Sequence, residues 1–427
     1  MTLAPGLHFH TPSFADIDAI ITLDAWAFAS NLTHEQARAT PLPLDFTRTV
    51  VVKDGEQFVG QHSSFAFTRF PVPGATLPVA GLSMVAVHPQ YRRRGILRAM
   101  MGVHLADCQR RGEAVSALFA AEPGIYGRFG YGQASQDVRI KISRGAALKP
   151  VPGSEELTVR IETKSQAAHG DLVNTVHHRA GARVGNTGLN RPGWVARETP
   201  ALQEHWHAEV DPVGGREPLR IVVVERAGEP VAYGTFRRSL NWAPTGPTGT
   251  VNVTEAVALD PAAAHRLWSA LINFDLSSTV TPFLLATDDP IINLLANNRQ
   301  VDQTIVDNMW VRIIDLPTAL AGRQYSAELD IVLDVTDAGL PDNAGRWRIT
   351  APAFGGPDGS ARATVSRSNE SAQISLDICE LGAIFLGGGS LSALAAAGRV
   401  IVHDPQVLAR GSAGFSWPNA PVANWVF

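Results

Sequence analysis

A strand that passes into a helix through an arginine-rich turn is the feature that most restricts how this chain can fold. Residues 82–87 are apolar and stop before Pro89, as a buried strand would. Residues 96–111 place apolar side chains on one face of a helix that Gly112 would cap. The turn between them holds three arginines and a glycine: Arg92, Arg93, Arg94 and Gly95. The sequence therefore predicts an α/β unit built around this basic turn.

The chemistry of this turn favours binding of a pyrophosphate. A helix start presents free backbone N–H groups and the positive end of the helix dipole. Gly95 allows the backbone to approach an anion closely, and the three arginines before it supply positive charge. The alternative is a basic turn that is only solvated. The strand before the turn and the amphipathic helix after it favour a phosphate site.

The middle of the chain repeats the pattern of its beginning. A mixed α/β domain is predicted over 1–148, and a proline-containing linker follows it. In the second segment, 155–315, residues 256–261 resemble residues 84–89, and a helix is predicted over 265–274. Alanines occupy the place of the arginines in this second segment. A degenerate copy of the first domain is the simplest account, and chance similarity is the alternative.

The last segment has a different pattern of predicted helices and strands. Residues 316–427 contain short strand signals and a helix of small residues near 391–398, which predicts an α+β domain. The full prediction is a mixed α/β and α+β protein of three domains.

The composition excludes several other classes of protein. A net charge of −4 over 427 residues gives no basic field for nucleic acid. No secretory signal or long apolar run is visible, so we expect a cytoplasmic protein without a membrane span. The two cysteines, Cys108 and Cys379, lack nearby cysteine or histidine partners, so we expect reduced thiols and no metal site.

Two runs of sequence carry a resemblance to a known family. The stretch 92–95 matches the Arg-x-x-Gly part of the GNAT acetyltransferase motif, although Leu97 stands where glycine or alanine is usual. Together with the glycine- and tyrosine-rich run 124–132, it resembles the enhanced intracellular survival (Eis) family of N-acetyltransferases. The resemblance implies two acetyltransferase domains, the second degenerate, and a sterol-carrier-protein-like third domain. It also implies a homohexamer, acetyl-CoA as donor and a primary amine as acceptor: an aminoglycoside, a polyamine or lysine in a peptide.

The same resemblance assigns donor-binding residues. The backbone of Val85 and Val87 would pair with the pantetheine arm as an added strand does. The pyrophosphate would bind at Arg92, Arg93, Arg94, Gly95 and Ile96, and Ala121 would lie near the thioester.

Two catalytic roles follow from the resemblance as well. Tyr126 would be the general acid that protonates the departing thiolate, and the terminal carboxylate of Phe427 would be the general base. A base is required because ammonium groups titrate near pH 10 and an amine must lose a proton to attack. The alternatives are a packed turn aromatic at Tyr126 and a frayed chain end at Phe427. The apolar ending 425–427 favours docking over fraying.

The acceptor wall is predicted to be poor in acids. Its members would be Asp24, Trp26, Phe28, Met84 and Phe119. The residue before the terminus is the uncharged Val426, so Asp24 is the one acid expected there. The expected reaction is therefore acetylation of an amine, and the composition of the wall does not single out aminoglycosides. Two other functions stay open at this point: a non-catalytic protein that binds acyl-CoA or lipid, and a transferase of longer acyl groups.

Overall fold

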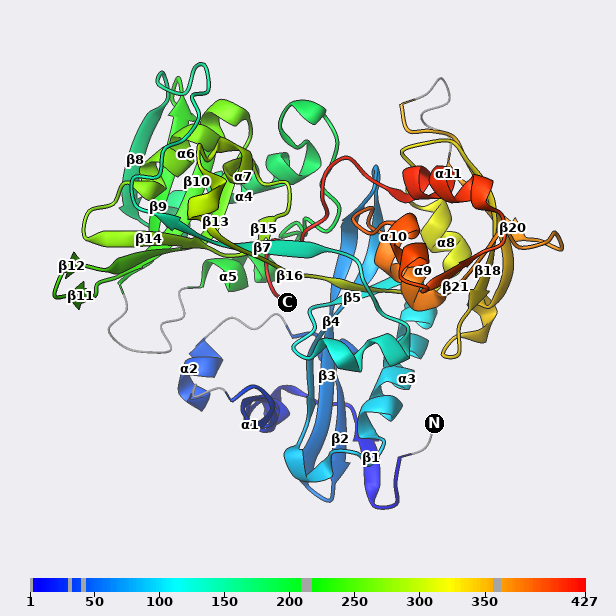
Figure 1. Ribbon diagram of the computed structural model, residues 1–427. Coiled ribbons are helices and arrows are strands. Elements are labelled where there is room, and N and C mark those ends of the chain that lie inside the picture. The colour runs from blue at the N-terminus through cyan, green and yellow to red at the C-terminus, as the bar shows by residue number, and fades with distance from the viewer. Residues whose placement is uncertain (1–2, 30–32, 40–43, 209–216, 356–361) are drawn as a thin grey trace.

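The computed structural model describes residues 3–29, 33–39, 44–208, 217–355 and 362–427. Three large sheets organise them, one for each part of the chain that the sequence distinguishes (Figure 1), and β11 (Trp242–Ala243) and β12 (Gly246–Pro247) form a separate two-stranded sheet. No helix among these residues is long and apolar enough to cross a membrane.

The first sheet has seven strands, and most of them come from the first third of the chain. Their order is β1 (Leu7–His10), β2 (Val50–Asp54), β3 (Gln57–Val72), β4 (Ala75–Val87), β5 (Val115–Leu118), β17 (Trp310–Ile313) and β6 (Gly132–Gln133). Helices α1 (Ile17–Phe28) and α3 (Ile96–Arg111) contact β3 and β4, and α2 (His34–Ala39) contacts α1. The predicted helix over 96–111 is confirmed with the same bounds, and Gly112 caps it in the left-handed region at φ 69°.

The second sheet repeats this order. It consists of β15 (Leu285–Ala286), β7 (Gln136–Ser143), β14 (Ser277–Pro282), β13 (Gly249–Ala258), β10 (Glu229–Ser239), β9 (Arg220–Arg226) and β8 (Thr158–Thr163), with β16 (Asp302–Asp307) also paired to β7. Its described helices are α4 (Gln166–Ala182), α5 (Pro200–His207), α6 (Pro261–Ile272) and α7 (Pro290–Leu294). The prediction started α6 four residues late, at 265, because it overlooked Asp260, whose side chain caps the helix at Ala263 N–H.

The two sheets exchange a strand. β7 follows β6 directly in sequence, yet it pairs antiparallel with β14 in the second sheet. In return, β17 leaves the second segment and pairs with β5 and β6 in the first sheet. The predicted linker at 149–154 comes after β7, so sheet membership crosses the domain boundary predicted at 148.

The third sheet consists of β20 (Thr364–Arg367), β19 (Gly345–Ala351), β18 (Leu329–Thr336), β21 (Ile374–Asp377) and β22 (Val400–Val402). Its helices are α8 (Leu316–Ala321), α9 (Ile378–Ile384), α10 (Leu391–Ala396) and α11 (Pro405–Phe415). Helix α9 packs on β17 and β6 of the first sheet. One apolar core joins side chains of β3, β4 and β5 to those of the third sheet and to Trp425 and Phe427. The chain end therefore lies between the parts, as Figure 1 shows at the label C.

Candidate functional site

A fork between β4 and β5 forms the centre of the candidate site. The two strands pair in parallel only where Val79–Gly81 meet residues 115–117. Beyond Gly81, β4 runs on to Val87 paired with β3 alone, while β5 ends at Leu118. Among the described residues no strand covers the free side of residues 82–87. Their outward backbone groups can therefore bind an extended ligand, in the manner of a strand added at a sheet edge.

An irregularity in β4 opens this fork. Gln61 faces Ala86 and Ser63 faces Ser83, so two residues of β4 stand opposite His62 alone. One of these two, Met84, has a φ of 52°, which is rare for a residue with a side chain. Such a bulge bends a strand and increases its twist. The bend turns the last part of β4 away from β5, at the level of Val85 and Val87.

The basic turn leads from the fork to the start of α3. Gly95 is the N-cap residue at φ 80°, and no side chain caps the helix. The first N–H groups of α3, from Ile96 onward, therefore point out of the helix without a capping partner. Arg92, Arg93 and Arg94 beside them are exposed. A Cβ atom placed on Gly95 would meet nothing within 4 Å, so the space before the helix is open.

Tyr91 fixes the shape of this turn. Its hydroxyl donates to Asp54 Oδ2 at 2.9 Å, which ties the turn to the β2–β3 hairpin. The guanidinium of Arg94 lies 4.7 Å from the centre of the Tyr91 ring. Arg93 adopts a φ of 64°, a conformation that residues with side chains rarely occupy. A held, strained turn of this kind is more common at ligand sites than elsewhere.

Tyr126 lies beside the fork, between two 3-10 turns, Pro123–Ile125 and Gly127–Phe129. Its side chain is buried and packs with Leu82 of β4 and Leu118 of β5. Burial, with a smaller contribution from the charge of Glu122, raises the pKa of Tyr126 to about 12. No hydrogen bond of this hydroxyl is found among the described residues. A protonated, uncommitted hydroxyl is suited to donate a proton at neutral pH.

The end of the chain docks against the other face of the fork. The ring of Phe427 lies 5.0 Å from Phe67 and 5.4 Å from Phe119. A Cβ atom on Gly81 would come within 3.1 Å of the same ring. Gly81 and Phe119 are the neighbours in sequence of the two leucines that contact Tyr126. Because side chains alternate between the faces of a sheet, Tyr126 and Phe427 lie on opposite faces of the fork at the same level.

Contacts along the last residues hold the tail in place. Asn308 accepts from the N–H of Ala423 at 2.8 Å and donates to its carbonyl at 3.2 Å. The N–H of Val422 donates to the carbonyl of Pro192 at 3.0 Å. Trp425 is buried and packs on Phe65 with ring centres 5.6 Å apart. The tail predicted to dock is thus docked, by hydrogen bonds as well as by its apolar rings.

The residues predicted as an acceptor wall fall into two groups. Phe119 lies with Phe427 in the fork, and Met84 packs against an apolar cluster that includes Ile20 and Leu23 of α1. Trp26 and Phe28, at the end of α1, are exposed, and the Trp26 ring is 5.4 Å from that of His88, which begins the basic turn.

Two more predicted residues have distinct environments. Asp24 is half-buried and has no ion pair among the described residues, and burial raises its pKa to about 6. A half-buried carboxyl without an ion pair is a candidate ligand for a cationic group. Ala121 is exposed in the segment that follows β5.

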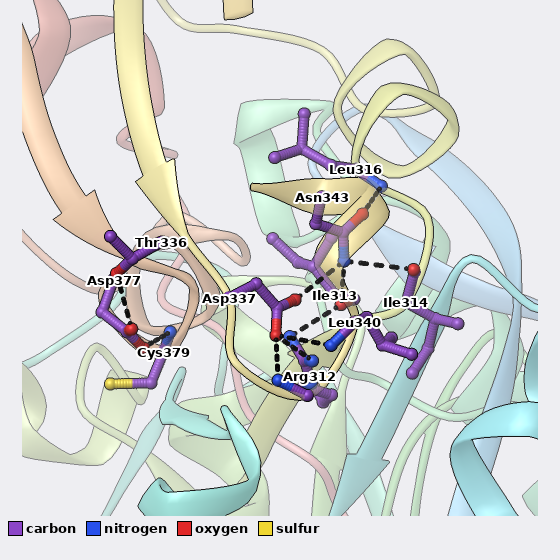
Figure 2. Close-up of polar contacts among 11 residues, drawn as sticks. Arg312, Ile313, Ile314, Leu316, Thr336, Asp337, Leu340, Asn343, Asp377 and Cys379 are labelled. Carbon is purple, nitrogen blue, oxygen red and sulfur yellow. Dashed lines mark hydrogen bonds and ion pairs between the residues drawn. The ribbon is translucent and has the colours of Figure 1, made fainter. Parts of the chain in front are cut away.

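A buried ion pair behind Tyr126 was not predicted. Arg312 of β17 is fully buried, and its Nη2 donates to Asp337 Oδ1 of the third domain at 2.7 Å (Figure 2). Asn343 donates to the other oxygen of this carboxylate at 3.0 Å. A Cβ atom on Gly130 would come within 2.8 Å of the Arg312 guanidinium, so Gly130 allows this close approach. Arg312 and Asp337 therefore support the turn that carries Tyr126.

The glycines at 130 and 132 were the available signal that other segments pack closely against this turn. Gly132 lies so close to α9 that an added Cβ would come within 1.8 Å of the carbonyl oxygen of Cys379. The sequence did not reveal the partner of Arg312, because Asp337 is 25 residues away and follows β18 of the third sheet.

Metal sites and disulfides are not seen in the part of the chain that the structure describes. No group of three or more His, Cys, Asp or Glu residues there could hold a metal ion. Cys108 and Cys379 are free, and burial raises the pKa of both thiols.

Comparisons with known proteins agree with this geometry. A family model described as acetyltransferase (GNAT) domain matches residues 9–134, another with the same description matches 193–313, and a sterol carrier protein domain model matches 316–424. These matches confirm the predicted duplication and the predicted nature of the third domain.

Relatives extend the similarity over most of the chain. An uncharacterized N-acetyltransferase of Streptomyces avermitilis is 36% identical over 379 residues, 88% of each chain. The N-acetyltransferase Eis of Mycobacterium tuberculosis is 32% identical over 425 residues, covering 95% of this chain and 96% of that one. The crystal structure of Eis1 from Mycobacterium abscessus is similar with a TM-score of 0.80 and 27% identity, covering 99% of this chain and all of that one.

Proposed function

The chain belongs to the Eis family of GNAT N-acetyltransferases, and we propose that it transfers an acetyl group from acetyl-CoA to a primary amine by direct attack on the thioester. The observation that carries this proposal is the open fork beside an uncapped, arginine-rich helix start. A strand edge and an anion site next to each other match the two ends of the donor, an extended amide arm and a pyrophosphate.

The donor would bind along the free side of β4. Backbone groups of Val85 and Val87 would pair with the pantetheine amides. The N–H groups from Gly95 and Ile96 onward, with the side chains of Arg92, Arg93 and Arg94, would bind the pyrophosphate. Ala121, exposed beyond the end of β5, would lie near the thioester. These residues fit the donor because each offers an unpaired donor group or an open approach.

The two proton transfers are proposed for residues on opposite faces of the fork. The amine nitrogen attacks the carbonyl carbon of the thioester, and the terminal carboxylate of Phe427 accepts the proton that the nitrogen gives up, directly or through water. The Tyr126 hydroxyl donates its proton to the sulfur as the carbon–sulfur bond breaks. The raised pKa of Tyr126 supports the second role, because the hydroxyl stays protonated at neutral pH.

The acceptor is proposed to be a primary amine with modest positive charge. Asp24 is the one acid among the wall residues, and Val426, which precedes the terminus, is uncharged and exposed. Trp26, Phe28 and Met84 would supply an apolar wall. Each carboxylate contributes attraction for an ammonium group, so a wall with one carboxylate favours lysine side chains or diamines over tricationic aminoglycosides and longer polyamines.

The family also leads us to propose a homohexamer, which sedimentation equilibrium would test: a mass near that of one chain would contradict it. The function itself is tested by incubation with acetyl-CoA and a panel of amines that includes aminoglycosides, polyamines and lysine peptides. We expect release of free thiol together with an acetylated amine, identified by its mass. Thiol release without an acetylated amine, or faster transfer from a longer acyl-CoA, would contradict the proposal.

A further inference from the structure

The last part of the chain runs along the second domain, on the segment that follows α4. Trp417 Nε1 donates to the Asn190 carbonyl at 3.0 Å, and the N–H of Val422 donates to the Pro192 carbonyl at 3.0 Å. A Cβ atom on Gly193 would come within 3.1 Å of the Val422 carbonyl oxygen. The tail is therefore fitted closely to the second domain before it reaches the fork of the first.

The last polar contact of the tail with the second domain joins Asn424 to His177 of α4. The side-chain nitrogen of Asn424 is hydrogen-bonded to Nε2 of His177, and both side chains are buried. Among the described residues, no hydrogen bond lies nearer along the chain to Phe427. The position of the terminal carboxylate therefore depends on this contact and on the packing of the last rings.

The surroundings of His177 fix its ring. It stacks on Trp194 with ring centres 5.0 Å apart, and its carbonyl accepts from Trp194 Nε1 at 3.0 Å. Glu255 Oε1, which accepts from Arg197 at 2.7 Å, lies 3.9 Å from Nε2 of His177. An amide nitrogen can only donate, so Nε2 must accept from Asn424 and the ring must be neutral. Burial, with a smaller contribution from the charge of Arg197, holds the pKa of His177 well below its usual value, which preserves this acceptor.

The apolar rings of the tail cannot fix the carboxylate by themselves. Burial of Trp425 and Phe427 favours a docked tail, but apolar packing has little directional preference. A hydrogen bond has a preferred length and angle, and the bond at Asn424 is only three residues from the end. Each residue of chain spans up to about 3.5 Å, so loss of this bond leaves the carboxylate free to move by several ångströms.

We propose that the second acetyltransferase-like domain serves as the holder of the chain end, and that His177 is a positioning residue for the terminal carboxylate. His177 acts through Asn424 and takes no part in proton transfer. The inference rests on the role proposed for Phe427, and it gives the second domain a function in the reaction of the first.

The first test compares two substitutions of His177. His177→Leu removes the acceptor, whereas His177→Gln supplies a side-chain oxygen that can accept from Asn424 in its place. Leucine and glutamine are similar in size and neither stacks as a ring, so the hydrogen bond is the main difference. Asn424→Ala removes the same bond from the side of the tail and leaves α4 intact, so it should match His177→Leu.

The readout is the rate at which carboxypeptidase A removes Phe427, followed by mass spectrometry, because the enzyme cleaves only a chain end that has opened. We expect His177→Leu to lose Phe427 about tenfold faster than the unmodified protein, since a lost buried hydrogen bond shifts an equilibrium by about this factor. His177→Gln should lose it at a nearly normal rate. Val173→Ala is the control: Val173 is buried one turn earlier in α4, outside the contacts of the tail, and its substitution should leave the rate unchanged.

Steady-state kinetics then test the link to turnover. His177→Leu should lower kcat about tenfold or more without a change in the KM for acetyl-CoA, because a small displacement of a reacting group is costly, and His177→Gln should restore kcat. One glycine appended after Phe427 already displaces the carboxylate, so in the extended protein His177→Leu should lower kcat little further. A merely structural role of His177 would instead make the two losses multiply.

Several results would overturn the proposal. Equal release of Phe427 from His177→Leu and His177→Gln would contradict the role of the hydrogen bond, as would normal release from Asn424→Ala. Normal kcat in a His177→Leu protein that releases its tail would contradict positioning of the carboxylate. The release assay needs no acetyl transfer, so an inactive unmodified protein would count against the proposed function and leave the result on the tail standing.

Discussion

The two acetyltransferase-like domains share a strand order but differ at the start of one helix. In the first domain eight residues, 88–95, separate β4 from α3, and they carry three arginines and Gly95. In the second domain two residues, Leu259 and Asp260, separate β13 from α6. The loop that could surround a pyrophosphate is missing from the second domain.

The second domain also fills its own helix start. Asp260 Oδ1 accepts from the Ala263 N–H at 3.0 Å, and Arg226 donates to both oxygens of the same carboxylate, at 2.9 and 3.1 Å. Burial opposes the charge of Asp260, but these bonds outweigh it and hold its pKa below the usual range. A carboxylate of the chain thus occupies the position at which the first domain leaves room for an external anion. The comparison teaches that the fold alone does not make the site, because one cap residue and six additional loop residues separate the two cases.

The largest expected effect is the loss of turnover on substitution of Tyr126 in the first domain. Tyr126→Phe keeps the ring and removes the proposed acid, so turnover should fall by about 10²–10⁴-fold, the usual range for a positioned acid or base. Steady-state kinetics would measure this fall, and calorimetry should show unchanged acetyl-CoA affinity. Turnover within about twofold of the unmodified protein would make Tyr126 a packing residue. Because burial raises the pKa of Tyr126 to about 12, its titration should cause no loss of activity between pH 7 and 10.

The next prediction tests whether the third domain supports the site of the first domain through the Arg312–Asp337 ion pair. Asp337→Asn leaves Arg312 buried without its carboxylate, which should lower the free energy of unfolding by about 3–5 kcal/mol. Turnover of the remaining folded protein should also fall, because Arg312 packs under Gly130 and the Tyr126 turn. Denaturant unfolding and kinetics would measure both.

Asp330→Asn is the matched control for this variant. It breaks an exposed pair with Arg348 in the same domain, and such pairs contribute about 0–1 kcal/mol. Equal losses of stability in Asp330→Asn and Asp337→Asn would contradict the importance of burial. Normal turnover in folded Asp337→Asn would show that the Arg312–Asp337 pair is not needed to position Tyr126.

An exchange of cap residues sharpens the comparison directly. Gly95→Asp places a carboxylate at the start of α3, as Asp260 does at the start of α6; a Cβ atom there meets nothing within 4 Å, but the φ of 80° strains any side chain, so thermal stability is measured beside affinity. Acetyl-CoA affinity should fall by about 10²-fold, since about 3 kcal/mol of charge-assisted bonding to phosphate is replaced by repulsion. Gly102→Asp adds the same charge at an open position within α3 and should bind normally. Equal affinities of the two variants for acetyl-CoA would contradict binding of the pyrophosphate at this helix start.

The smallest expected effect concerns the acceptor. Asp24→Asn should raise the KM for a cationic amine about fivefold, which corresponds to roughly 1 kcal/mol for a partly exposed ion pair. Burial raises the pKa of Asp24 to about 6, so its charge is present above pH 6 and is lost as the pH falls through 6. The KM of the unmodified protein should therefore rise below pH 6, and that of Asp24→Asn should not. Parallel pH profiles would exclude Asp24 as an acceptor ligand.

Local features of the sequence predicted the elements around the site well. Helix α3 was predicted with its exact bounds because its apolar face and Gly112 are both local signals. The turn between β2 and β3 was visible as Asp54-Gly55, and the apolar ending 425–427 indicated a docked tail. In these regions the local sequence and the tertiary contacts favour the same secondary structure.

Pairings between distant segments could not be predicted in this way. The exchange of β7 and β17 depends on contacts between strands more than a hundred residues apart, which leave no local pattern. Arg312 and Asp337 resemble surface charges in the sequence, since charged residues are rarely buried unless paired. The first half of β4, 75–81, was missed because prolines and Gly74 around it resemble a loop. Helix α4 was missed because its buried face carries His169 and His177 where apolar residues are usual.

Extension of the chain end tests the central claim, that the third domain completes the site of the first. One glycine appended after Phe427 moves the carboxylate by about 3.5 Å, more than a hydrogen bond can absorb. We expect turnover to fall strongly while acetyl-CoA affinity and thermal stability stay unchanged, and a glycine added before Met1 should change none of them. Full turnover in the C-terminally extended protein would contradict the account, because the base would then have to be another group.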